Sequence, residues 1–174
     1  MSGIKKDFVK QAEILKAWLC SQVGYKRLED TYNKEHYRLA KVTGPLQFEQ
    51  TYLRVGSATI NFDCKPQRFL KVGEYPIEMV QSGILYNPTR FKALPLIKVY
   101  GTGAGTLNIA GTVIGIKSID GYIVLDSDTQ NAYKGTVNKN NTVDAPDFPT
   151  LPTGQIPISW SGGITKIEIT PRWW

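Results

Sequence analysis

Apolar side chains near the start of the chain recur at intervals of three and four residues, the spacing that places them on one face of an α-helix. The apolar stripe consists of Ile4, Phe8, Ala12, Leu15 and Leu19, and Val9 and Trp18 widen it. Gly24 follows as a residue that readily adopts the left-handed conformation found just after helices. Lysines and acids share the polar face. This mixture favours a helix of about twenty residues packed on the sheet that follows over a helix lying on a membrane surface.

From Tyr37 onward, apolar and polar positions alternate with the two-residue period of β-strands, as in the apolar set Ala58, Ile60, Phe62 and Cys64. Six further short apolar runs are separated by clusters of glycine, asparagine and proline, at 96–100, 106–109, 112–116, 122–125, 156–160 and 164–169. Short strands with no helix between them predict a β-sandwich. We therefore expect a mainly β protein. A looser pattern with two turn-forming glycines between Pro66 and Pro95 indicates a boundary near 80–86, between a helix-plus-antiparallel-sheet domain in 1–81 and a β-sandwich domain in 82–174.

Three glycine-containing segments predict tight connections between these strands. Residues 119–122 read Ile-Asp-Gly-Tyr, a strong hairpin signal. The Ser-Gly-Gly run at 161–163 is expected to join 156–160 and 164–169 as a half-buried hairpin. Residues 101–106 superficially resemble a dinucleotide-binding fingerprint, but the third glycine comes one place early and a strand follows where a helix is needed. A hairpin connection is the better interpretation there.

The chain ends on two indoles, Trp173 and Trp174. Each tryptophan removes about 200 Å² of surface from water only if other residues cover it, so we expect this end to be docked. Alternation also predicts that Trp160 points into the core beside Ile158. The long segment 131–152, rich in asparagine, aspartate, threonine and proline, is expected to be a loop and a candidate functional surface.

Several ordered motifs resemble siphophage distal tail proteins, the Dit family. In the second half of the chain they are 87–101, 122–126 with Gln130 and Tyr133, 148–154, 158–160 and 171–174, and upstream they are 17–19, 24–30, 37–40 and 57–70. The resemblance covers nearly the whole chain. It implies a partial ring domain followed by a galectin-like β-sandwich, and it gives packing roles to eight residues. These are Trp18, Tyr25, Asn87, Pro88, Trp160, Arg172, Trp173 and Trp174.

The resemblance further implies a structural component of a siphovirus or prophage tail tip. Family members form a hexameric ring that joins the tail tube to tail-tip or baseplate proteins. The expected partners are therefore further copies of the chain, the tail tube protein, and tail-associated lysin or tail fibre proteins. The expected location is the virion tail, and the bacterial host cytoplasm during assembly.

One departure from the family pattern concerns the start of the chain. The family's ring domain begins with β-strands ahead of the helix, whereas Met1 stands only a few residues before it here. A prophage remnant, an alternative start and a trimmed form are all compatible with this pattern. A sheet lacking those strands would expose an edge and apolar surface. We therefore expect the chain alone to be monomeric or to form heterogeneous oligomers.

Charge and candidate chemistry exclude several classes of function. The net charge of +6 is spread as +4 over residues 1–80 and +2 over 81–174, without the basic stripe typical of nucleic-acid binders. No apolar run approaches the ~18 residues of a membrane span, and no signal peptide is evident. Cys20 and Cys64 are too few for a disulfide framework or a metal pattern, and we expect buried free thiols.

The chain offers little catalytic chemistry. His36 has no nucleophile motif nearby. Residues 126–131 resemble the start of a calcium loop but lack its glycine and glutamate, so a turn at a strand end is expected. A glycosidase needs two carboxylates as its acid and base, and the candidates are Asp120, Asp126, Asp128, Asp144 and Asp147. They are expected mostly in turns, where aspartate is simply a favoured residue. We therefore expect no enzyme, no cofactor, no metal, no nucleic acid and no membrane partner.

A carbohydrate-binding module for host cell-wall glycans is the alternative function. The predicted sandwich and the indoles of Trp160, Trp173 and Trp174 support it, because sugars stack on aromatic rings. Stacking requires an exposed ring, however, and the alternation that turns Trp160 inward favours assembly over glycan binding.

Overall fold

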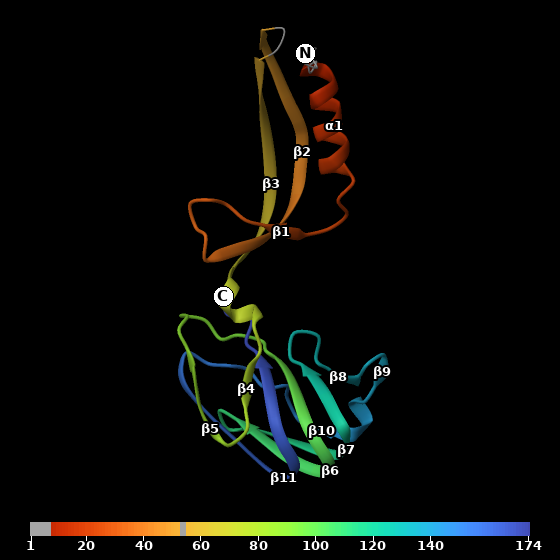
Figure 1. The fold of residues 1–174 in the computed structure, drawn as a ribbon, viewed down its shortest axis with the longest axis vertical. Helices are drawn as coiled ribbons and strands as arrows, with labels where there is room; N and C mark the ends of the chain where they lie inside the picture. Colours follow the sequence, from red (N-terminus) through yellow and green to blue (C-terminus); the bar gives the residue numbers. More distant parts are fainter. Residues whose placement is uncertain (1–7, 53–54) are drawn as a thin grey trace, which may run out of the picture. The chain divides into compact units, whose positions relative to one another are not determined.

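The computed structural model describes residues 8–52 and 55–174, which fall into two units, one ending at Arg68 and one beginning at Phe69 (Figure 1). Most described residues lie in antiparallel strands, as the sequence predicts. The boundary predicted at 81/82 differs from the observed one. Residues 69–81 belong to the second unit because they pair with the last strand and with the end of the chain.

Unit 1, residues 8–52 and 55–68, is a helix beside a three-stranded sheet. Helix α1 spans Phe8–Cys20, and the strands are β1 (Lys26–Leu28), β2 (His36–Tyr52) and β3 (Val55–Leu70), in the order β1-β2-β3. The helix lies along β2 (Figure 1). It ends where the Ser21 amide donates to the Ala17 carbonyl at 3.0 Å, and Gly24 has a φ of +73°. Ile4 of the predicted stripe lies outside the described residues.

Unit 2, residues 69–174, is an eight-stranded antiparallel sheet with two short 3-10 turns. Its elements are η1 (Lys71–Glu74), β4 (Ile77–Met79), β5 (Gly83–Asn87), β6 (Leu96–Ile109), β7 (Thr112–Asp126), β8 (Asn131–Lys134), β9 (Val137–Asn138), η2 (Asn140–Thr142), β10 (Val143–Asp144) and β11 (Gly154–Thr170). The central order is β4-β11-β6-β7-β8-β9; β5 pairs with β11 and β10 with β7. The predicted loop 131–152 is therefore partly ordered into short strands.

Three long strands, β6, β7 and β11, give this sheet its two layers (Figure 1). In β11, residues 154–158 pair with β5 and residues 167–169 pair with β4, so its two halves border different strands. Buried side chains from both halves of the long strands meet in one core. The largest fully buried ones are Ile97, Leu107, Ile109, Ile114, Ile116, Ile119, Ile123, Leu125, Leu151, Ile156, Ile158 and Ile167.

The three predicted hairpin turns were wrong, because all three segments lie inside these long strands. Residues 101–106 belong to β6, 119–122 to β7 and 161–163 to β11. The register of β11 against its neighbour β6 shifts between Gly162 and Lys166, where the two backbones approach closely. A Cβ on Gly163 would overlap the Thr102 carbonyl, and one on Gly101 would overlap the Gly163 carbonyl. Glycine here permits close approach within a bent sheet.

The connection between β6 and β7 is instead a two-residue turn at Ala110 and Gly111. Their φ angles are +50° and +89°, the conformation of a type I′ hairpin turn. Alanine is unusual at such a position, since positive φ favours glycine and asparagine. The expected turn after Asp126 is confirmed, because β7 ends there and β8 starts at Asn131.

The end of the chain is docked, as the sequence predicts. Trp173 is buried, and its carbonyl accepts from the Leu70 amide at 2.8 Å. The Arg172 amide donates to the Gly73 carbonyl at 2.8 Å. We call this pairing of 70–73 with 172–173 the terminal clasp. Trp174 stacks on Phe91, with ring centroids 4.8 Å apart and planes 5° from parallel.

Candidate functional site

An apolar groove lies in unit 1 between α1 and the sheet, with a volume of about 360 Å³. Helix α1 contributes Leu15, Trp18 and Leu19, and β2 and β3 contribute apolar side chains from the facing sheet. The strand residues are Ala40, Val42, Ile60 and Phe62. The groove follows from two periodicities that face each other: the helical stripe and the alternating strand positions.

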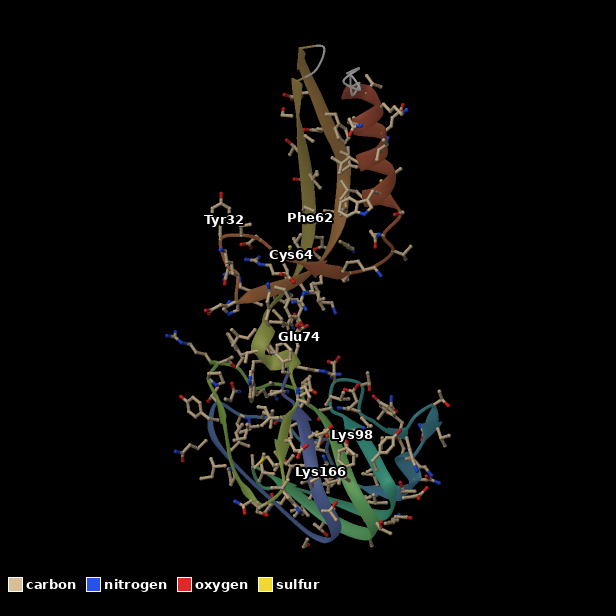
Figure 2. The ribbon with its side chains drawn as sticks, in the orientation of Figure 1. Tyr32, Phe62, Cys64, Glu74, Lys98 and Lys166 are labelled. Carbon is tan, nitrogen blue, oxygen red and sulfur yellow. The ribbon has the colours of Figure 1, made fainter. Side chains whose placement is uncertain are left out.

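This groove exposes apolar surface that a folded core would cover. Leu19 and Ala40 are the buried hydrophobic residues among the described side chains of unit 1. In contrast, Trp18 is 61% exposed and Phe62, labelled in Figure 2, is 39% exposed. The sequence predicts that Trp18 lies on the packing face of the helix. In the structure, its side chain lines the groove. Contiguous exposed apolar surface of this kind marks contact sites for other macromolecules.

Polar side chains on the same sheet form a fixed network. The Tyr25 hydroxyl donates to Asp63 Oδ2 at 2.8 Å, and Lys41 Nζ lies 3.3 Å from the same carboxylate oxygen. The hydrogen bond from Tyr25, followed by the one from Lys41, holds the pKa of Asp63 below its usual value. Lys41 and Lys65 also lie over the Tyr25 ring. Tyr25 is thus the centre of a cluster that joins the residues after α1 to β2 and β3.

Asn87, at the end of β5, is a buried junction in unit 2. Its amide nitrogen donates to the carbonyls of Phe91 and Leu151 at 3.0 and 3.1 Å, and its oxygen accepts from Thr89. All hydrogen-bonding groups of the Asn87 side chain therefore have partners. The adjacent Pro88 is exposed. Together these contacts fix the loop that carries Phe91, the stacking partner of Trp174.

Arg172 reaches across unit 2 to Asp126, with a 2.7 Å contact between Nη1 and Oδ1. Burial raises the pKa of Asp126, but Arg172 and the backbone amides of Asp128 and Thr129 outweigh burial and lower it overall. The structure thus brings Arg172 and Trp173 together in the terminal clasp. It places Trp160 elsewhere, partly buried against the core.

Aromatic rings in unit 2 differ in exposure: Tyr75 and Tyr86 are exposed, whereas lysines lie over Tyr100 and Tyr122. On the outer face of β6 and β7, Lys98 Nζ lies 4.8 Å from the Tyr100 ring centre and 4.5 Å from that of Tyr122. Lys166 Nζ also lies over the Tyr100 ring, 4.7 Å from its centre. Figure 2 labels both lysines. Trp173 is buried and Trp174 is stacked, so a sugar would have to displace existing partners to stack on these rings.

Potential metal ligands are dispersed in the part of the chain that the structure describes. Its histidine, cysteine and carboxylate side chains form no group that could hold a metal ion. The ring nitrogen Nδ1 of His36 lies 2.8 Å from Asn33 Oδ1. Cys20 and Cys64 are free thiols, but the expectation that they are buried was wrong: Cys20 is exposed and Cys64 is half-buried. Within residues 8–52 and 55–174, no helix is long and apolar enough to cross a membrane.

Comparison with known proteins identifies the fold. No protein-family model matches the chain, and no curated protein matches its sequence. Among solved structures, the chain is similar to the Dit protein of phage SPP1, described as a paradigm of the hub adsorption apparatus in phages that infect Gram-positive bacteria. The similarity has a TM-score of 0.72 at 10% identity and covers 97% of this chain and 74% of the SPP1 chain. This chain therefore has the fold of a phage distal tail protein.

Proposed function

We propose that this protein is a structural component of a phage tail tip, a hub that joins the tail tube to tail-tip or baseplate proteins. The observation that carries this proposal is the similarity, over 97% of the chain, to a protein of a phage hub adsorption apparatus. The partners are tail proteins and further copies of the chain. The location is the virion tail, after assembly in the host cytoplasm.

Unit 1 is the assembly domain in this proposal. Its groove leaves Trp18 and Phe62 exposed, and two hydrophobic side chains, Leu19 and Ala40, are buried in its described part. A unit with so small a core gains stability when another protein covers its apolar face. Self-association through this face accounts for the exposed tryptophan better than an unpartnered surface does.

In this proposal, unit 2 is the galectin-like sandwich and has no catalytic role. Its core is extensive, and lysines lie over Tyr100 and Tyr122 on the outer face of β6 and β7. The alternative function, binding of cell-wall glycans, gains no specific support from these contacts. We therefore assign unit 2 to contacts with other tail proteins.

The self-association of the purified full chain tests the proposal. We expect light scattering to give a mass above that of the monomer, increasing with protein concentration. Replacing Trp18 by glutamate should shift the distribution toward monomer, because a carboxylate in an apolar contact is costly to desolvate. The matched control is Ile84→Glu in unit 2, which removes an equally exposed apolar side chain, 65% against 61%.

Two results would contradict this proposal. One is a full chain that stays monomeric at all concentrations and fails to associate with tail proteins from the same phage genome. The other is an equal effect of the Trp18 and Ile84 substitutions on self-association, which would show that the groove is not part of the interface. Hydrolysis of peptidoglycan that disappears on changing a single aspartate would indicate an enzyme instead.

A further inference from the structure

A second, polar pocket in unit 1 has a volume of about 200 Å³. Its walls come from the end of β1, the loop that follows, the start of β2 and the end of β3. The lining residues are Leu28, Asp30, Tyr32, Asn33, His36, Tyr37, Arg38 and Arg68. Two arginines and a histidine line this pocket, whereas the apolar groove is lined by one arginine, Arg27.

The two arginines are available to a ligand. Among residues 8–52 and 55–174, no carboxylate forms an ion pair with Arg38 or Arg68, although Asp30 lines the same pocket. A guanidinium has five donors in a fixed plane and is matched best by an oxyanion. Two guanidiniums in one pocket therefore form a site for an anion.

The loop between β1 and β2 is held in shape before any ligand arrives. Asp30 Oδ1 accepts from the backbone amides of Tyr32 and Asn33 at 2.9 and 2.7 Å. The His36 amide donates to the Asn33 carbonyl at 3.3 Å, and the His36 ring contacts the Asn33 side chain. A loop that is already ordered loses little conformational freedom on binding, which favours affinity.

Charge selects the kind of anion. Two arginines and one aspartate give the pocket a formal charge of +1, which complements a monoanion. Any anion bound here meets the Asp30 carboxylate, and a phosphate dianion is repelled more strongly than a monoanion because it carries twice the charge. Tyr32, at the rim, is 99% exposed and projects from the loop (Figure 2). Tyrosine and arginine are enriched among the residues that contribute most to the binding energy of protein interfaces.

We propose that this pocket binds the carboxylate of an acidic side chain presented by another polypeptide. Arg38 and Arg68 pair with the carboxylate oxygens, and Tyr32 packs on the neighbouring chain. The site is separate from the apolar groove, apart from Leu28, which borders both. The assignment does not depend on the hub function, since it rests on the pocket's own charge and order.

Titration of the full chain with a blocked glutamate, its amine acetylated and its α-carboxyl amidated, tests the site. The readout is the chemical shift of the arginine Nε–H groups. We expect saturable shifts at Arg38 and Arg68, and a loss of affinity of about tenfold in Arg68→Gln. Arg68 is exposed, so this variant should fold. Lys34→Gln, which removes an exposed cation from the same loop, should stay within about twofold of the parent protein.

Two further ligands are titrated in parallel at the same ionic strength. One is inorganic phosphate, and the other is blocked glutamine, a neutral probe of the same shape. Glutamate binding that exceeds both supports the proposal. Phosphate binding more tightly than blocked glutamate would overturn the carboxylate assignment. Shifts that never saturate, or that fall equally in Lys34→Gln and Arg68→Gln, would show general attraction to a basic surface and no site.

Discussion

Individual glycines determine whether the sheet of unit 2 can bend. Gly101 and Gly163 approach each other so closely that a methyl group on either would overlap a carbonyl of the other strand. The φ angle of Gly163 is not in the left-handed region, so its requirement for glycine is steric. Gly162, with a φ of +74°, adds a conformational requirement beside it.

We therefore expect Gly163→Ala to destabilise unit 2 by about 2 kcal/mol or more, the range of forced overpacking. Gly83→Ala is the matched control, because its methyl would meet the flexible end of Met79 at 3.3 Å. Its effect should stay within about 0.5 kcal/mol. Urea unfolding of both variants measures the difference, and equal stabilities would show that the strands separate easily at the bend.

The ion pair between Arg172 and Asp126 predicts a pH-dependent stability. The pKa of Asp126 is lowered in the fold, so its contribution is present above the unfolded carboxyl value of about 3.9 and is lost as pH falls through the folded value. Arg172→Gln should cost about 1–3 kcal/mol at pH 7, and this cost should shrink as pH falls through the folded pKa of Asp126.

The variant Asp126→Asn completes a double-mutant cycle for this pair. If the contact is direct, the double variant should lose less than the sum of the two single losses. Strict additivity at pH 7 would mean that the Arg172 side chain stabilises the fold through contacts other than Asp126, since its backbone hydrogen bond to Gly73 is retained in the glutamine variant.

At the scale of elements, alternation in the sequence predicted the strand residues but not where strands end. The runs 96–100 and 106–109 were assigned correctly to strands, yet they form one strand, β6. Glycine permits both a tight turn and the close approach of two neighbouring strands. Which of the two a glycine serves depends on the strand that pairs with it. The paired positions of glycines in β6 and β11 are the signal that could have revealed the bend.

The candidate sites, too, could be predicted only in part from the sequence. The helical stripe correctly included Leu15, Trp18 and Leu19, but the sequence could not tell that Trp18 stays exposed. Exposure depends on how much of the sheet faces the helix. Arg38 and Arg68 were missed because they are thirty residues apart in sequence, and only the pairing of β2 and β3 brings them to one pocket.

The position of β4 predicts which fragment folds best. Alternation indicates that 82–174 buries its own core, but the structure adds β4 and the terminal clasp from residues 70–79. A fragment of 69–174 should therefore be more stable than one of 82–174 by about 3 kcal/mol, from several backbone hydrogen bonds and the burial of Leu70 and Met79. Cooperative urea transitions at the same midpoint would contradict this.

For the whole molecule, the two units differ in how much apolar surface they bury. The described part of unit 1 buries Leu19 and Ala40 as hydrophobic residues, whereas unit 2 has a large continuous core. A two-unit chain of this kind need not unfold in one step. Unit 1 should depend on association for much of its stability.

Calorimetry of the full chain should accordingly show two transitions, with unit 2 unfolding at the higher temperature. The lower transition should rise by about 3–6 °C for a tenfold increase in protein concentration, because association stabilises only the folded state. Trp18→Glu should abolish this dependence and leave the upper transition unchanged. A lower transition that is independent of concentration would exclude stabilisation by association.

The terminal clasp has a consequence for engineering and for gene rearrangement. Leu70 and Gly73, where the chain enters unit 2, are hydrogen-bonded to Trp173 and Arg172, where it leaves. A domain whose entry and exit are adjacent can be inserted into a surface loop of another protein without stretching either connection. By the same geometry, a short linker could join the two ends and new termini could be opened at the Ala110-Gly111 turn, giving a circular permutant with the same core.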